Sequence, residues 1–251
     1  MNSKNFLNNK KIILDNFNKR KFEKVIKLGK KFLKTNSDFQ ILYALGLTYI
    51  TLKNYLEAEK IFRDIILIKP NAENFYIYGN IHKQLKNYNE ALENFSKAIN
   101  LKSDYSEAYN NLGNTQFKLG FFDKAVENYQ KAIKFNKKNI PAYFNLAHAY
   151  SEDKNFDDLK KVLQEILKLD EKNTTALNDL GYVNLILGNI DEGRKLFERV
   201  ISIDDKHIRA FKNYFLITKI KKDNKLFKKL EEIDLSNVND EDKIFAYTSL
   251  S

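Results

Sequence analysis

One small residue recurs in this sequence at an almost constant interval. It directly follows a leucine or a tyrosine, and its successive positions lie 33, 34, 34 and 34 residues apart: Gly46, Gly79, Gly113, Ala147 and Gly181. A fixed period of this size is typical of helix–turn–helix repeats, in which each repeat stacks on the next. The period therefore predicts an all-α fold, a right-handed superhelical solenoid of antiparallel helix pairs.

Each repeat has the same order of large and small residues. The first helix carries a large residue four places before the small one (Leu42, Phe75, Tyr109, Tyr143, Leu177) and another directly before it (Leu45, Tyr78, Leu112, Leu146, Leu180). After a short turn, the second helix carries three rows: Ala58, Ala91, Ala125, Leu159 and Gly193; then Phe62, Phe95, Tyr129, Leu163 and Phe197; then Ile65, Ala98, Ala132, Ile166 and Val200. Spacings of three and four residues place each set on one helical face, so both helices are expected to bury one stripe.

A glycine inside a helix costs about 1 kcal/mol relative to alanine, so its recurrence at one phase of the repeat needs a packing reason. We expect the first helix of each pair to press against the second at this position, with aromatic side chains filling the space around the contact. Gly113, facing Ala125 and Ala132, is expected to make the tightest of these contacts.

This pattern resembles the tetratricopeptide repeat. The resemblance covers about two-thirds of the chain in five units: 39–71, 72–105, 106–139, 140–173 and 174–207. The sequence departs from the family in two respects. The proline that usually closes each unit is kept only as Pro70, and the tyrosine near the end of the first helix is kept only as Tyr49 and Tyr150.

The two ends of the chain are less regular. Residues 1–38 are interpreted as a degenerate, basic first hairpin, and residues 208–251 as divergent C-terminal helices. Asn239 is expected to cap a last helix whose side chains Ile244, Phe245 and Tyr247 either cap the stack or continue into a longer protein. This end also resembles the junction between such repeats and a sulfotransferase domain in bacterial proteins, which implies that the chain could be the recognition arm of a larger enzyme.

The sequence contains no pattern typical of an enzyme. It has no cysteine, its three histidines (His82, His148, His207) lack metal-ligand spacing, and no glycine-rich phosphate loop or nucleophile motif is present. His82 and His148 are expected to be packed or solvent-facing. We therefore predict a protein that is not an enzyme and that uses no cofactor and no metal.

The net charge of +10 is confined to the ends of the chain. Residues 1–38 carry 11 basic and 3 acidic side chains, whereas residues 39–207 carry 23 of each. A nucleic-acid-binding protein usually has a basic stripe along its working face, so no nucleic-acid partner is expected. No apolar run has the length of a membrane span, and the N-terminus lacks a secretory pattern, so a cytoplasmic protein with no membrane partner is predicted.

The remaining candidate site is the inner, concave face, which the first helices would line. One row on this face has an amide or its isostere in four of six repeats: Ala44, Ile77, Asn111, Asn145, Asp179 and Asn213. Amides carry both donors and acceptors, so one per repeat can hold the backbone of an extended peptide. The full set of predicted peptide-binding residues is Asn111, Asn145, Asp179, Asn213, Asn80, Asn114, His148, Asn110, Tyr76 and Lys83.

This row resembles the asparagine ladder of O-GlcNAc transferases, which implies that Asn111, Asn145 and Asn213 contact a peptide backbone. The opposing interpretation is that asparagine is abundant here and that these side chains are solvated. The places that would grip the acidic tails of heat-shock chaperones hold Glu73, Glu107, Asn110 and Phe144, so that adaptor function is not expected.

The predicted function is a non-catalytic scaffold that binds a partner protein or an extended peptide in the concave groove. The first alternative is the recognition arm of a larger sulfotransferase or O-GlcNAc-transferase-like enzyme. The second is an adaptor whose basic ends bind nucleic acid or a membrane surface. The sequence indicates no particular oligomeric state.

Overall fold

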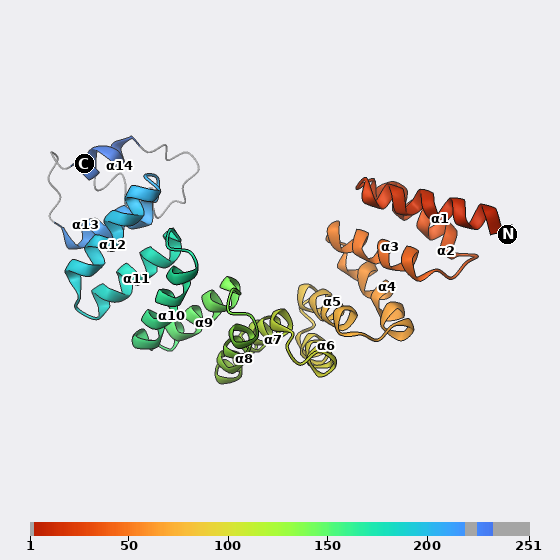
Figure 1. Ribbon diagram of the computed structural model, residues 1–251, viewed down its shortest axis with the longest axis horizontal. Helices are drawn as coiled ribbons and strands as arrows, with labels where there is room; N and C mark the ends of the chain where they lie inside the picture. The colour runs from red at the N-terminus through yellow and green to blue at the C-terminus, as the bar shows by residue number, and fades with distance from the viewer. Residues whose placement is uncertain (1–2, 219–224, 233–251) are drawn as a thin grey trace. The chain divides into compact units, whose positions relative to one another are not determined.

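The computed structural model describes residues 3–218 and 225–232 (Figure 1), which form fourteen α-helices and no strand. None of these helices has the length and apolar character needed to span a bilayer. The helices are α1 (Ser3–Asn18), α2 (Phe22–Leu33), α3 (Phe39–Thr51), α4 (Tyr55–Ile68), α5 (Ala72–Gln84), α6 (Tyr88–Leu101), α7 (Ser106–Lys118), α8 (Phe122–Phe135), α9 (Ile140–Glu152), α10 (Phe156–Leu169), α11 (Thr174–Ile186), α12 (Ile190–Ile203), α13 (Ile208–Ile217) and α14 (Lys225–Glu231).

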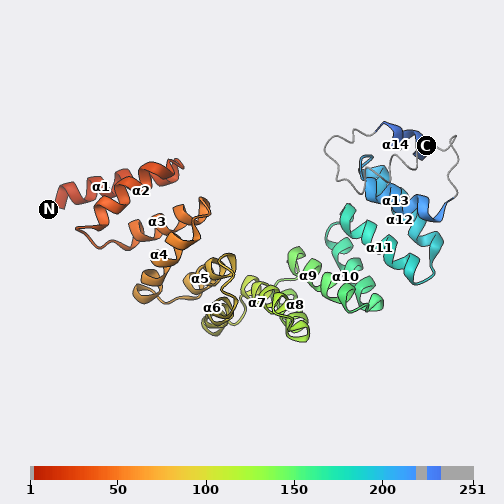
Figure 2. The same cartoon turned by 180° about the vertical axis from the view of Figure 1, so that it is seen from behind.

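The chain divides into two compact units, Met1–Asn136 and Lys137–Ser251. The first contains α1 to α8, and the second contains α9 to α14. Within each unit, helices that follow one another in sequence pack side by side, as α3 does with α4 and α11 with α12 (Figures 1 and 2). The all-helical fold of stacked helix pairs that the period predicts is confirmed.

The core of each pair is the stripe of the second helix. All three rows predicted from the spacing are buried, and Phe62, Phe95 and Phe197 are completely enclosed. Burying one aromatic side chain of this kind contributes about 1.5–3 kcal/mol, so the stripe is a large part of the stability of each pair. On the first helices the large residue directly before the small one is buried in every unit, whereas Leu42, Phe75 and Tyr109 are half-buried.

The recurring glycines lie directly against these aromatic rings. A Cβ atom on Gly113 would lie 2.8 Å from Cε1 of Tyr129 and 3.1 Å from the carbonyl oxygen of Ala125. The expected close approach is confirmed, but its partner is the ring of Tyr129, and Ala132 is not among the nearest groups. The tightest contact is also not at Gly113, because a Cβ on Gly181 would lie 2.6 Å from the ring of Phe197.

Asparagine is frequent at the starts of the helices. Five asparagines are N-caps whose side-chain oxygen accepts a hydrogen bond from a backbone N–H of the first turn: Asn54, Asn71, Asn139, Asn155 and Asn173. Such a cap contributes about 1 kcal/mol by satisfying a donor that has no partner inside the helix. Much of the asparagine content therefore has a structural role outside the candidate face.

The turn inside each of the five regular pairs contains one residue in the left-handed conformation. In two turns this residue is glycine, Gly120 and Gly188, each with a φ of 81°. In the other three it is a lysine: Lys53, Lys86 and Lys154, with φ between 57° and 62°. A side chain in this region is strained by about 1–2 kcal/mol, whereas glycine is not.

Replacing Lys86 with glycine should therefore stabilise the first unit. We expect the free energy of unfolding to rise by about 0.5–1 kcal/mol. The relief of backbone strain exceeds the cost of the extra chain entropy that glycine loses on folding. Urea unfolding followed by circular dichroism measures the change. Lys97→Gly, on the exposed surface of α6, is the control. It should lower the free energy of unfolding by about 1 kcal/mol, because glycine is a poor helix former. A lower midpoint for Lys86→Gly would show that the turn is not strained.

The first hairpin, α1 and α2, belongs to the first unit. Lys10 of α1 forms an ion pair of 2.7 Å with Asp38, which also caps α3. At the other end, Leu230 of α14 is buried in the cluster of α12 and α13. The predicted last helix, with Asn239, Ile244, Phe245 and Tyr247, lies outside the described residues.

Candidate peptide-binding face

Four of the predicted binding residues meet on the first helices of the first unit. Asn111 of α7 donates from Nδ2 to Oδ1 of Asn80 (2.8 Å) and to the hydroxyl of Tyr76 (3.1 Å), both on α5. Its Oδ1 accepts a hydrogen bond from Nζ of Lys83, also on α5, at 3.2 Å. We call Tyr76, Asn80, Lys83 and Asn111 the amide cluster; its members are half-buried.

Lys83 is a partly desolvated cation. Burial lowers the pKa of its ammonium group, and burial is the sole cause of this shift. Among the described residues Lys83 makes no ion pair, and its polar contact is with the amide oxygen of Asn111. A half-buried ammonium held by an amide can still donate its other protons to a carbonyl or carboxylate oxygen of a guest.

Aromatic side chains continue this face toward the N-terminal ends of the first helices. The rings of Tyr76 and Tyr105 lie 5.0 Å apart, and the hydroxyl of Tyr43 donates to Oε1 of Glu73 at 3.2 Å. Burial, then the nearby Tyr76 and the carboxylates of Glu107 and Glu73, raise the pKa of Tyr105 to about 12. Sequence reasoning missed Tyr43, although its spacing of 33 residues from Tyr76 places both in the same row of the repeat.

Two predicted residues of the first unit are engaged inside their helix pair. Asn110 is only 9% exposed. Oδ1 of Asn114 accepts a hydrogen bond from the buried hydroxyl of Tyr129 at 2.9 Å, so this amide holds the ring that covers Gly113. Asn110 is therefore less accessible than the members of the amide cluster, whereas Asn114 is half-buried as they are.

The second unit has a smaller polar cluster. Asn178 of α11 donates to the carboxylate of Asp179 at 3.3 Å and accepts a hydrogen bond from Nδ2 of Asn213, on α13, at 3.1 Å. Burial raises the pKa of Asp179, whereas the hydrogen bond from Asn178 and the nearby Arg209 and His207 act against this shift. The buried Asn178 joins these two predicted residues and was not itself predicted.

Asn145 and His148 lie on α9, in the second unit. Asn145 is half-buried, and His148 is exposed with its Nε2 atom 3.8 Å from the carboxylate of Glu152. His82, by contrast, is packed: it is 7% exposed, its ring lies 4.4 Å from that of Tyr78, and burial lowers its pKa. Within the described ranges, no three His, Asp or Glu side chains are placed to hold a metal ion.

Family models of helical repeats match most of the regular region. Three models are described as tetratricopeptide repeat. One of them matches both residues 39–71 and residues 174–207, the second matches residues 106–139, and the third matches residues 128–160. A fourth model, described as TPR repeat, matches residues 79–120. Together these matches cover more than half of the chain. A search of curated proteins finds no match.

Solved structures of repeat proteins share the fold. The C-terminal part of a TPR repeat-containing protein from Cytophaga hutchinsonii is 17% identical, with a TM-score of 0.77 over 96% of this chain and 99% of that one. MamA from Desulfovibrio magneticus, from residue 41 to its end, is 17% identical, with a TM-score of 0.60 over 68% and 98%. YrrB, described as a TPR protein with an unusual peptide-binding site, is 17% identical, with a TM-score of 0.58 over 73% and 95%.

Proposed function

Because this chain belongs to the tetratricopeptide repeat family, we propose that it is a scaffold that binds an extended segment of another protein. The binding surface is the face of the first helices, which carries the amide cluster in the first unit. The family is one of interaction modules, and the description of YrrB names a peptide-binding site in a protein of the same fold. The segment-binding role, the identity of the face and the residues below are our proposal.

The observation that carries this proposal is the set of unused donors in the amide cluster. Asn111 uses both of its amide hydrogens, on Asn80 and Tyr76. Among the described residues, Nδ2 of Asn80, the hydroxyl hydrogen of Tyr76 and two ammonium hydrogens of Lys83 have no acceptor. Backbone carbonyl groups of an extended guest are acceptors that match these donors without requiring any particular side chain.

The other predicted residues extend this role in the proposal. In the second unit, Asn145, Asp179 and Asn213 occupy the same place of the repeat, Asp179 offers acceptors only, and His148 adds an exposed imidazole. Asn110 and Asn114 position the first helix of their pair. The protein is proposed to act without catalysis, cofactor or metal, in the cytoplasm, and on a protein partner instead of nucleic acid or membrane.

The alternative role as an arm of a larger transferase depends on residues 208–251. Most of the segment after α13 lies outside the described residues, apart from α14. The resemblance to a sulfotransferase junction therefore stays a prediction, and so does the adaptor role of the basic ends.

A peptide selection tests the proposed function. Random 12-residue peptides displayed on phage are selected on the wild-type chain, and the affinities of the selected peptides are measured by fluorescence polarisation. We expect Asn80→Ala/Lys83→Ala to weaken their binding at least tenfold, because both removed groups supply donors to the guest. Asn89→Ala/Lys97→Ala, on the second helix α6, is the matched control and should bind as the wild type does.

Two results would contradict the proposal. Either no extended peptide is enriched, or the enriched peptides bind the Asn80→Ala/Lys83→Ala variant as tightly as the wild type while its helical circular dichroism is unchanged.

A further inference from the structure

A second surface of the first unit has the form of a groove. It has a volume of about 610 Å³ and lies between the second helices α2 and α4, with α3 as its floor. The floor consists of Leu42, Leu45 and Tyr49, which are spaced along one stripe of α3. Leu67 of α4 stands at its edge with 78% of its surface exposed. This groove lies apart from the amide cluster, which is on α5 and α7.

A buried hydroxyl lies in the floor of this groove. Tyr49 is 3% exposed, and its hydroxyl has no hydrogen-bond partner in the described part of the chain. The hydroxyl nevertheless lies near the ammonium group of Lys30, because interaction with Tyr49 is the largest cause that raises the pKa of Lys30. A tyrosine is the residue that the repeat pattern itself has at this place: the equivalent positions hold His82, Gln116 and then Tyr150.

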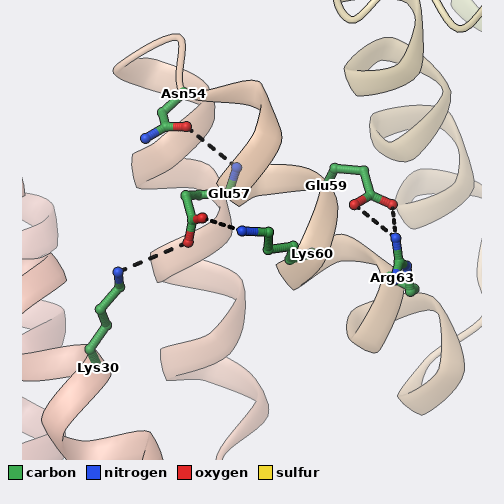
Figure 3. Close-up of polar contacts among 6 residues, drawn as sticks. All are labelled: Lys30, Asn54, Glu57, Glu59, Lys60 and Arg63. Atoms are coloured by element: carbon green, nitrogen blue, oxygen red, sulfur yellow. Dashed lines mark hydrogen bonds and ion pairs between the residues drawn. The ribbon is translucent and has the colours of Figure 1, made fainter.

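An ion pair between two lining residues joins the α2 and α4 walls (Figure 3). Lys30 of α2 reaches Glu57 of α4 at 4.0 Å, and its Nζ atom lies 5.6 Å from the centre of the Tyr49 ring. Glu57 has a second and closer partner, Lys60, at 2.5 Å (Figure 3). Glu57 therefore keeps a counter-charge if Lys30 moves to another carboxylate.

The two walls carry opposite charges. The α2 wall presents Lys30 and Lys34, and the α4 wall presents Glu57 and Asp64. Lys34 and Asp64 are exposed and make no ion pair among the described residues. A guest that complements both walls carries acidic side chains on the flank facing α2 and basic side chains on the flank facing α4.

We propose that this groove binds an amphipathic α-helix of a partner protein, with an apolar stripe between an acidic and a basic flank. The two walls and the floor are helices whose backbone groups are already paired, so an extended strand would find backbone partners only at the end formed by residues 36–38. From Glu57 to Leu67 the α4 wall spans ten residues, or about 15 Å, which matches about three turns of a guest helix. An acidic side chain of the guest pairs with Lys30 in place of Glu57.

The probe for this site is a phage-displayed library of 14-residue helical peptides, selected on the wild-type chain. We expect enriched peptides to have apolar residues at helical spacing, acidic residues on one flank and basic residues on the other. Leu67→Glu should weaken their binding at least tenfold. Leu56→Glu, on the same helix at a leucine that is 66% exposed and does not line the groove, should leave it unchanged.

Reversing the walls tests the charge arrangement. Lys34→Glu/Asp64→Lys reverses one charge on each wall and leaves Lys30 and Glu57 in place, so it should bind the selected peptides more weakly and should reduce the difference in affinity between them and peptides with exchanged flanks. Because the chain contains no cysteine, Leu67→Cys and Leu56→Cys can each carry a single environment-sensitive dye. Only the dye at position 67 should shift its fluorescence emission when a helical peptide binds.

The proposal is overturned if no helical peptide is enriched on the wild type relative to Leu67→Glu, or if Leu56→Glu weakens binding as much as Leu67→Glu does. It is independent of the proposed function, because Asn80→Ala/Lys83→Ala should not change binding of the helical peptides, and Leu67→Glu should not change binding of the extended ones.

Discussion

Gly79→Ala is expected to destabilise the first unit by about 2 kcal/mol, although alanine is the better helix former. The new Cβ would lie 2.8 Å from two atoms of the Phe95 ring and 3.2 Å from a third. Phe95 is fully buried, so its ring cannot turn into solvent to relieve the contact. Overpacking of this kind costs about 1–3 kcal/mol, which exceeds the gain of about 1 kcal/mol in helix propensity. Urea unfolding of the purified chain measures the loss.

The matched control has the opposite sign. Gly29 lies inside α2, and a Cβ there would meet its nearest neighbours, Ile41 and Leu45, at 3.7 and 3.9 Å, which is ordinary contact. Gly29→Ala should therefore stabilise the unit by up to about 1 kcal/mol through helix propensity alone. In the Phe95→Leu background, Gly79→Ala should lower the free energy of unfolding by less than it does in the wild type, because the smaller side chain relieves the overlap with the new Cβ. Equal effects of the two alanine substitutions would rule out the close approach at Gly79.

The helix pairs could be predicted from the sequence because their cause is local and repeated. Each pair needs a small residue on one helix and a ring sixteen residues later on the other, and this requirement appears at the same phase in four of the five units. The exact partner of Gly113 could not be predicted. The spacing places both Ala132 and Tyr129 on the facing stripe, and only the packed side chains show that the ring lies on the glycine.

The candidate site was accessible to sequence reasoning in part. The period places Asn80 and Asn111 on first-helix faces, but it does not show whether neighbouring side chains reach one another across two helices. That depends on side-chain length and direction, which is why the contact between Asn111 and Lys83 appears only in the structure. The groove was not predicted, because it depends on the separation of α2 and α4, and no spacing along one helix specifies that distance.

Asn111→Ala should lower the free energy of unfolding of the first unit by about 2 kcal/mol. This is the second large effect that we expect. The substitution removes three hydrogen bonds, one of them from a charged donor, and such bonds contribute about 0.5–3 kcal/mol each before water replaces part of the loss. Lys83 would also lose the amide that solvates its half-buried ammonium. Asn89→Ala, at an exposed asparagine of α6, should change the midpoint of urea unfolding by less than about 0.5 kcal/mol.

Two further variants separate this structural role from a role in binding. Asn111→Asp places a carboxylate beside Lys83, which should return the pKa of Lys83 toward its ordinary value, but it removes the two hydrogens that Asn111 donates to Asn80 and Tyr76, so part of the stability loss should remain. In the Lys83→Met background, Asn111→Ala should cost about 1 kcal/mol less than in the wild type, because the charged hydrogen bond is already absent. Full additivity would show that the two side chains do not interact in solution. The amide cluster would then lack the contact between Asn111 and Lys83.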